Sequence, residues 1–253
     1  LIDEAIRHSI TKMSHLHFTA AEKYKERVIQ LGEKPESVFC TGGMAIESIK
    51  NLSLLSKREL EEDLNFTFGK KNLLVTFHPV TLEDNSSKKQ FSNLLESLSI
   101  LEDTKIIFTK SNADTYGKVI NEMIDRFVRS NKERSIAFSS LGQLRYLSCL
   151  KFVDAIVGNS SSGLLEAPSF KIATVNIGDR QRGRLRPDSV IDCDTSPQSI
   201  NKSINKIYSK DFKKVLSEVK NPLDKGRASK KIKRILENVS IEDILKKKFR
   251  DIG

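Results

Sequence analysis

Short apolar segments alternate with helical patterns through most of the chain, from residue 72 onward. Six apolar segments are expected to be strands, at residues 73–77, 105–108, 135–138, 155–157, 172–176 and 189–192. Helical patterns separate most of them, at residues 87–101, 114–129, 141–150 and 164–167. Apolar strands that alternate with helices are typical of a parallel sheet covered on both faces. The pattern therefore predicts an α/β fold with a doubly wound parallel sheet.

Further elements are expected before and after this region. Helical periodicity predicts helices at residues 2–13, 44–52, 195–208, 225–236 and 241–249, and short strands are expected at residues 15–18 and 37–41. Two capping boxes, Thr19 with Glu22 and Ser56 with Glu59, predict the starts of two more helices. The first of these two is expected to end at Gly32.

One stretch, DAIVGNSSSGLLEAPSF at residues 154–170, combines a strand, a Gly/Ser turn and a short helix. Backbone N–H groups and the positive end of a helix dipole meet at such a turn and favour an anion. Ser160, Ser161 and Ser162 add hydroxyl donors, and Glu166 could accept hydrogen bonds from ribose hydroxyls. A serine-rich turn with a capping serine has the same composition. This stretch alone leaves both interpretations open.

The segments that follow four of the other predicted strands are also rich in polar residues. They are His78 and Pro79, then Lys110, Ser111 and Asn112, then Ser139 and Ser140, and finally a loop at residues 178–184 with Arg180, Arg182 and Arg184. Ligands of open parallel sheets bind beyond the carboxyl ends of the strands. Hydroxyls, an imidazole, an amide and arginines at one edge suit a ligand with a diphosphate and sugar hydroxyls. A solvated basic loop and a structural histidine are the alternatives.

The charge of the chain is unevenly distributed. The formal net charge is +10, and residues 201–253 hold 16 Lys/Arg against 7 Asp/Glu. The lysines of this region alternate with apolar residues at helical spacing, as on a solvated helix face, and no series of interleaved aromatic residues offers a platform for base stacking. We therefore expect no nucleic-acid partner. With 38% hydrophobic residues and no apolar run of transmembrane length, no membrane association is expected either.

The thiols and histidines give no sign of a metal site. Cys40, Cys149 and Cys193 are far apart and fit thiols in a reducing cytoplasm, where we expect the protein to be located. His15 and His17 share one side of a predicted strand but lack a partner ligand, so a structural role is favoured. The chain opens in a helical pattern, without an initiator Met or a signal peptide, and we expect its beginning to be missing.

The chain resembles the hydrolysing UDP-N-acetylglucosamine 2-epimerases, the branch that makes N-acetylmannosamine for sialic-acid synthesis. The matching pieces are DEAIRHSITKMSHLHF (3–18), VTFHPVT (75–81), GNSSSGLLEAPSF (158–170), NIGDRQRGR (176–184) and NPLDKGRASKKIKRIL (221–236). This resemblance implies two Rossmann-like domains in the architecture of B-type glycosyltransferases, the first of them incomplete here. Residues 1–45 would end the first domain and residues 46–220 would form the nucleotide-binding domain. Residues 221–253 would pack across the junction.

The resemblance also implies a nucleotide site. Ser160 and Ser161 would bind the diphosphate, and Glu166 the ribose hydroxyls. Arg180 would lie beside the nucleotide and Asn112 near the uracil. The implied partner is a UDP-sugar, and the family implies a homo-oligomer.

Two further residues are implied in the chemistry. His78 would approach the phosphates and the reacting sugar, and Asp3 matches one of three catalytic acids, of which the other two precede Leu1. The family reaction removes the C2 proton, eliminates UDP to give 2-acetamidoglucal, and adds water with inversion, without a metal or cofactor. Because two acids are missing, the isolated chain is expected to be inactive or weakly active.

Three other functions stay open at this point. A sister epimerase acts on a UDP-linked 2,4-diacetamido-trideoxy sugar on the way to legionaminic acid, and its sugar pocket would lie largely outside this chain. A glycosyltransferase of the same architecture would need an acceptor. A non-catalytic remnant would bind only a nucleotide or a partner protein.

Overall fold

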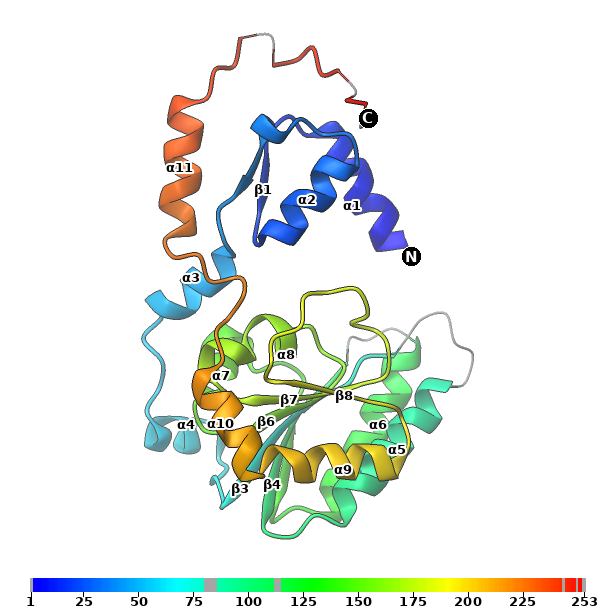
Figure 1. The fold of residues 1–253 in the computed structure, drawn as a ribbon. Coiled ribbons are helices and arrows are strands. Elements are labelled where there is room, and N and C mark those ends of the chain that lie inside the picture. The colour runs from blue at the N-terminus through cyan, green and yellow to red at the C-terminus, as the bar shows by residue number, and fades with distance from the viewer. Residues whose placement is uncertain (1, 80–85, 112–114, 243, 249, 252–253) are drawn as a thin grey trace. The chain divides into compact units, whose positions relative to one another are not determined.

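The computed structural model describes residues 2–79, 86–111, 115–242, 244–248, 250 and 251 (Figure 1). The chain forms two compact units, residues 52–221 and residues 1–51 with 222–253. Each unit is described by itself, and the three-part division expected from the resemblance stays a prediction. None of the helices in the described ranges combines the length and the apolar composition of a membrane span.

The larger unit contains a six-stranded sheet in which every neighbouring pair of strands is parallel. Its strands are β3 (Lys71–Thr76), β4 (Thr104–Thr109), β5 (Ser135–Phe138), β6 (Ala155–Gly158), β7 (Ala173–Ile177) and β8 (Val190–Cys193), in the spatial order β5-β4-β3-β6-β7-β8. All six predicted strands are therefore present, with ends shifted by at most two residues. This order is that of a doubly wound dinucleotide-binding fold, and the predicted fold class is confirmed.

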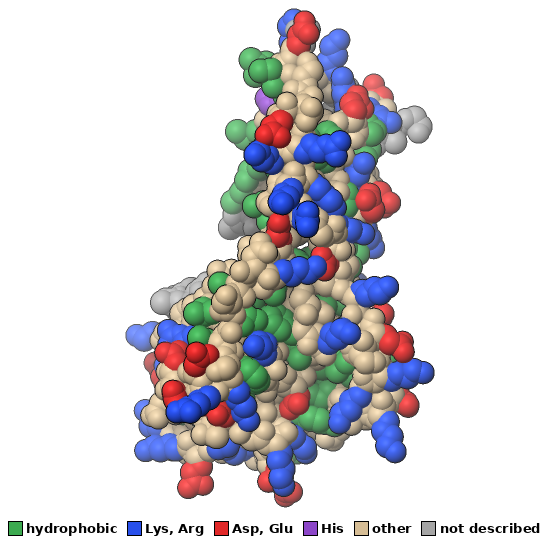
Figure 2. Space-filling model, turned by 90° about the vertical axis from the view of Figure 1, so that its left-hand side faces the viewer, with side chains coloured by type: hydrophobic (Ala, Val, Ile, Leu, Met, Phe, Trp, Pro, Cys, Tyr) green, Lys and Arg blue, Asp and Glu red, His purple; other side chains and the backbone are tan. Residues whose placement is uncertain are grey.

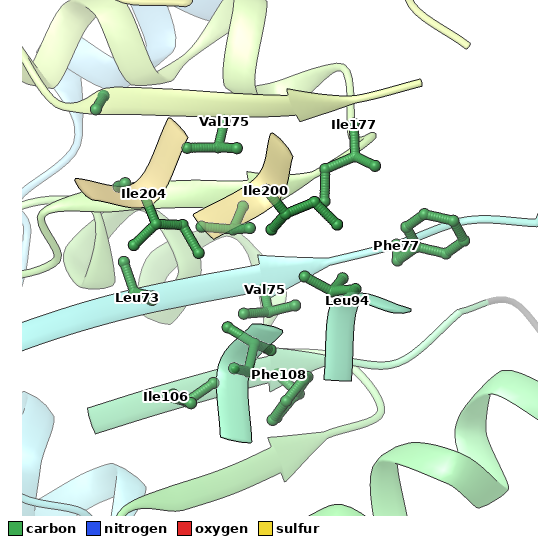
Figure 3. Close-up of a cluster of buried hydrophobic side chains, with 14 of the residues drawn as sticks. Leu73, Val75, Phe77, Leu94, Ile106, Phe108, Val175, Ile177, Ile200 and Ile204 are labelled. Carbon is green, nitrogen blue, oxygen red and sulfur yellow. The ribbon is translucent and has the colours of Figure 1, made fainter. Parts of the chain in front are cut away.

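Helices of the larger unit pack on both faces of the sheet. They are α4 (Lys57–Leu64), α5 (Ser86–Ser99), α6 (Thr115–Ser130), α7 (Gly142–Cys149), α8 (Ser162–Leu165), the 3₁₀ turn η2 (Ala167–Phe170), α9 (Pro197–Ile207) and α10 (Lys210–Glu218). Along β3, Leu73 and Val75 point into one apolar cluster with residues of α5 and α9 (Figure 3). Leu74, between them, is also fully buried and faces the opposite side of the sheet. Burial on both faces explains why the strands read as continuous apolar runs.

The smaller unit holds a two-stranded parallel sheet and four α-helices among its described residues. Its elements are α1 (Ile2–Met13), β1 (His17–Thr19), α2 (Glu22–Gln30), the 3₁₀ turn η1 (Pro35–Ser37), β2 (Val38–Cys40), α3 (Met44–Asn51) and α11 (Ala228–Asn238). The C-terminal α11 packs on α3, and Glu47 of α3 accepts hydrogen bonds from the backbone N–H and hydroxyl of Ser229. A carboxylate thus caps the first turn of α11 from a distant segment.

A buried carboxylate ties the C-terminal segment to the same unit. Glu33 is 2% exposed and pairs with Lys12 at 2.7 Å, with Lys247 at 2.8 Å and with His17 at 3.0 Å. Lys247 also donates to three carbonyls at the end of α1. Burial alone would raise the pKa of Glu33, but the two lysines outweigh it and lower that pKa. The predicted structural role of His17 has its physical reason in this cluster.

The structure corrects two predicted helical signals. The Thr19/Glu22 capping box is wrong: Thr19 belongs to β1, its hydroxyl donates to the carbonyls of Ala21 and Phe39, and Ala21 precedes α2 without a side-chain cap. The helix predicted at 241–249 is also wrong, because the described residues of that segment are not helical. Leu245 is 82% exposed there, and a short helix without a buried face is not stable in water.

One helix was not predicted, and one capping box is confirmed. The missed helix, α10, begins after Ser209, whose side chain accepts from the backbone N–H of Phe212. At α4, Ser56 and Glu59 form the predicted reciprocal capping box.

On the face drawn in Figure 2, Lys and Arg side chains are scattered among carboxylates. This distribution agrees with a solvated basic surface.

Candidate functional site

The candidate site lies where the strand order of the larger unit reverses, between β3 and β6. These two strands are neighbours, and Thr76 is the register partner of Gly158. Their carboxyl ends therefore open at the same point of the sheet edge, which is where open α/β sheets bind ligands. The segment after β3 begins with Phe77 and His78, and the segment after β6 is the Gly/Ser turn.

Asn159 connects the two strand ends. Its side chain is 1% exposed, its Oδ1 accepts from the backbone N–H of His78 at 2.7 Å, and its Nδ2 donates to the carbonyl of His78 at 2.8 Å. The backbone carbonyl of Asn159 accepts from Arg180 Nη1 at 3.0 Å and from Gln181 Nε2 at 2.7 Å. Three segments that are far apart in sequence thus meet at one residue.

The serines of the turn, Ser160, Ser161 and Ser162, are half-buried. The hydroxyl oxygen of Ser160 accepts from the backbone N–H of Ser162 at 3.3 Å, and the carbonyl of Ser160 accepts from Gly163. The backbone N–H groups of Ser160 and Ser161 have no acceptor among the described residues. Thr174 of β7 stabilises the end of the turn, because its hydroxyl donates to the carbonyl of Gly163 at 2.7 Å. Fixed and unpaired N–H donors of this kind suit an anion.

Glu166 is half-buried just after α8 and takes part in a hydrogen-bonded chain. Its Oε2 accepts from the hydroxyl of Ser162, which in turn accepts from the hydroxyl of Tyr146 at 2.6 Å. Oε1 of Glu166 has no partner among the described residues. Burial raises the pKa of Glu166, and the hydrogen bond from Ser162 acts in the opposite direction.

Arg180 follows β7 in the loop that begins at Gly178. The residue is exposed as a whole, but its guanidinium reaches inward to Asn159. Desolvation, followed by the charge of nearby Arg184, lowers the pKa of Arg180. Arg182 and Arg184 are exposed, whereas Gln181, which lies between Arg180 and Arg182, is 1% exposed. Of the three arginines in this loop, Arg180 is therefore the one that the structure joins to the turn.

The structure brings together most, though not all, of the predicted site residues. His78, Ser160, Ser161, Glu166 and Arg180 lie in segments that meet at the carboxyl ends of β3, β6 and β7. Asp3 belongs to α1 of the smaller unit, and Asn112 lies outside the described residues. Lys110 and Ser111, which precede Asn112, were predicted at the same strand end. Lys110 is paired with Asp125 at 2.6 Å, and Ser111 donates to the carbonyl of Phe77.

The contacts of three residues of the site were not predicted. Asn159, Tyr146 and Gln181 each act through a side-chain contact with a distant segment, and periodicity carries no information on such contacts. The one available signal was the position of Asn159 directly after a buried strand, at the start of the Gly/Ser turn. In the described part of the chain, no group of three or more His, Cys, Asp or Glu could hold a metal ion.

Comparison with known sequences identifies close relatives. The family described as UDP-N-acetylglucosamine 2-epimerase matches residues 1–237. The GDP/UDP-N,N'-diacetylbacillosamine 2-epimerase (hydrolyzing) of Campylobacter jejuni is 44% identical over 252 residues, which are 99% of this chain and 65% of the relative. The polysialic acid biosynthesis protein P7 of Escherichia coli is 43% identical over 250 residues, 98% of this chain and 62% of the relative. The chain thus spans less than two thirds of the length of these relatives.

Solved structures share the fold. The Staphylococcus aureus MnaA–UDP co-structure matches with a TM-score of 0.71 and 19% identity, over 96% of this chain and 65% of that one. The UDP-GlcNAc 2-epimerase of Methanocaldococcus jannaschii in complex with UDP-GlcNAc and UDP matches with a TM-score of 0.70 and 21% identity. That match covers 90% of this chain and 62% of the other.

Proposed function

Because this chain belongs to the UDP-N-acetylglucosamine 2-epimerase family, we propose that it supplies the nucleotide site of a hydrolysing 2-epimerase of a UDP-linked 2-acetamido sugar. One observation carries the proposal: the Gly/Ser turn, Glu166 and Arg180 meet at the switch point of a doubly wound sheet. This is the edge at which the fold binds nucleotides.

The contacts suggest a role for each group. The N–H groups of Ser160 and Ser161, the hydroxyl of Ser160 and the guanidinium of Arg180 would bind the diphosphate. Oε1 of Glu166, which has no partner among the described residues, would accept from the ribose hydroxyls. Asn112, outside the described residues, would lie near the uracil. The same donors would meet the negative charge that develops on the diphosphate when the sugar–oxygen bond breaks.

In the proposed reaction a carboxylate removes the C2 proton of the sugar, and UDP leaves to give an unsaturated 2-acetamidoglucal. Water then adds with inversion at C2. Asp3 is proposed as one of the acid/base carboxylates, and His78 as a donor to the phosphates and the reacting sugar. The side chain of Asn159 bonds the backbone N–H and carbonyl of His78. These two bonds fix the start of the segment after β3, which carries the imidazole.

UDP binding is the direct test of the nucleotide site. Glu166→Ala, Ser160→Ala and Arg180→Ala are each expected to weaken UDP binding by about tenfold, because each removes a hydrogen bond to a charged group or to ribose. Isothermal titration calorimetry on this chain measures the effect. Glu122→Ala is the matched control, because Glu122 is an exposed carboxylate on α6. If UDP binds Glu166→Ala as tightly as the unchanged chain, the ribose assignment is wrong.

Asp3 is expected to affect turnover and not nucleotide binding. Asp3→Asn keeps the size of the side chain and removes its basicity, so UDP affinity should stay within about twofold while turnover of the intact protein is lost. Release of UDP from the nucleotide sugar measures turnover, and calorimetry measures affinity. A variant that retains the unchanged rate would exclude Asp3 from the proton transfer.

Two substrates are supported by different relatives. A UDP-N-acetylglucosamine substrate on the sialic-acid pathway agrees with the likeness to the polysialic acid protein. A UDP-linked diacetamido-trideoxy sugar agrees with the likeness to the diacetylbacillosamine epimerases, and the Campylobacter relative of this kind is 44% identical. Offering both nucleotide sugars to the full-length protein separates these possibilities. If neither substrate releases UDP, the non-catalytic nucleotide-binding function is favoured.

A further inference from the structure

Tyr146 and Ser162 form a directed chain of hydrogen bonds that ends at the carboxylate of Glu166. The Tyr146 hydroxyl donates to Ser162 Oγ at 2.6 Å, and the Ser162 hydroxyl donates to Oε2 of Glu166. The three residues come from α7, from the first position of α8 and from the residue that follows α8. A hydroxyl has one proton to donate, so the donation from Tyr146 leaves the proton of Ser162 directed to Glu166.

The chain is well supported at its tyrosine end. Thr76 of β3 is near the phenol and acts weakly on its pKa, and the hydroxyl of Thr76 pairs with that of Thr109 on β4. Burial raises the pKa of Tyr146, so its phenol stays protonated and remains a donor at neutral pH. The donor is therefore a buried phenol on α7 that is directed at Ser162.

At the other end, the two oxygens of Glu166 differ. Oε2 is engaged by Ser162, whereas Oε1 has no partner among the described residues. A hydrogen bond to one oxygen restricts the rotation of a carboxylate, so the second oxygen has fewer directions open to it. Such a carboxylate is preorganised to accept from a ligand hydroxyl, and it loses less rotational freedom on binding than an unrestrained side chain.

We propose that Tyr146 is a positioning residue that acts through Ser162 to direct Glu166 at the ribose hydroxyls, and so sets the preference for ribose over deoxyribose. The inference rests on the proposed function, which places the ribose at Glu166. A carboxylate with a fixed direction rejects the sugar that lacks the hydroxyl, because its desolvated acceptor is then left unpaired.

The test compares the dissociation constants of UDP and 2′-deoxy-UDP, measured by calorimetry on this chain. The unchanged chain is expected to prefer UDP by about tenfold or more, and Glu166→Ala to abolish that preference. Tyr146→Phe is expected to reduce the preference to about a third, by weakening UDP alone while 2′-deoxy-UDP binds within about twofold of its unchanged affinity. A merely structural role would weaken both nucleotides alike.

Two further variants complete the experiment. Ser162→Ala should reduce the preference at least as much as Tyr146→Phe, and the double variant should resemble Ser162→Ala, because both changes interrupt one chain. Tyr208→Phe removes the same hydroxyl from a tyrosine that instead contacts Asp154, at the opposite edge of the sheet, and should leave the preference unchanged. Melting temperatures establish that each variant is folded.

The outcomes separate this inference from the proposed function. If Glu166→Ala loses the preference while Tyr146→Phe or Ser162→Ala retains it, the positioning role is wrong and the nucleotide site stands. If the unchanged chain binds both nucleotides equally, or Glu166→Ala keeps the preference, the ribose assignment fails and the positioning role fails with it.

Discussion

Gly158→Ala is expected to lower the free energy of unfolding by about 4 kcal/mol, or to prevent folding. Gly158 has a φ of +136°, and a Cβ built on it would lie 2.0 Å from the carbonyl oxygen of Thr76 and 2.8 Å from its carbonyl carbon. The neighbour is backbone of the paired strand, so it cannot rotate away as a side chain could. An added methyl group must therefore force β3 and β6 apart where they open into the site.

Gly142→Ala is the matched control for this prediction. Gly142 also has a positive φ, of +62°, but nothing lies within 4 Å of the position that a Cβ would take, so the cost is expected to be about 1 kcal/mol. The chain contains no Trp, so urea unfolding is followed by circular dichroism. If the two variants are equally stable, close approach of the strands is not the reason for glycine at position 158.

The close approach at Gly158 has a consequence for the site. It places the next residue, Asn159, at the distance from which its amide can span both backbone groups of His78. The Gly/Ser turn and the segment of His78 are therefore held in one arrangement by the same contact between strands. At this point of the sheet, the backbone conformation of Gly158 and the packing of β3 against β6 together set the position of the residues that are proposed to bind UDP.

Sequence patterns predicted the sheet well because its strands are buried on both faces. Leu73, Leu74 and Val75 form a continuous apolar run, and such runs between helices leave few alternatives. The rule that ligands bind at the carboxyl ends of parallel strands then located the candidate site. The predicted residues that meet at this edge belong to segments that follow strands, so the order of the strands in the sheet sets where these residues lie.

Contacts between side chains and distant backbone could not be predicted. Asn159 and His78 are 81 residues apart, and the hydrogen bond from Tyr146 to Ser162 joins two separate helices, α7 and α8. Helical and strand periodicity do not indicate which buried side-chain amide forms hydrogen bonds between the ends of two neighbouring strands. Local signals also failed where tertiary context prevailed, as at Thr19, which pairs in a strand instead of capping a helix.

Asn159→Asp is expected to lower the free energy of unfolding by about 3 kcal/mol at pH 7.5, and by clearly less at pH 4.5. The change replaces the Nδ2 donor, now 2.8 Å from the carbonyl of His78, with an oxygen at a site that is 1% exposed. When ionised, the introduced carboxylate would face that carbonyl as one acceptor against another. When protonated, it could donate to the same carbonyl and restore the lost bond.

The pH dependence has a definite sign. Burial and the facing carbonyl raise the folded-state pKa of the introduced carboxyl above its unfolded value of about 3.9. The destabilisation is therefore absent below that unfolded value, grows as the pH rises, and is complete above the raised pKa. The free energy of unfolding of the variant, subtracted from that of the unchanged chain at the same pH, isolates this contribution.

Asn159→Ala supplies the comparison, because it removes both hydrogen bonds to His78 and introduces no titrating group. Its deficit is expected to be about 3 kcal/mol and nearly the same at both pH values. UDP affinity should fall in both variants, since the segment of His78 and the serine turn lose their common support. A deficit of Asn159→Asp that does not change between pH 4.5 and 7.5 would show that the amide does not join the two strand ends by donating to His78.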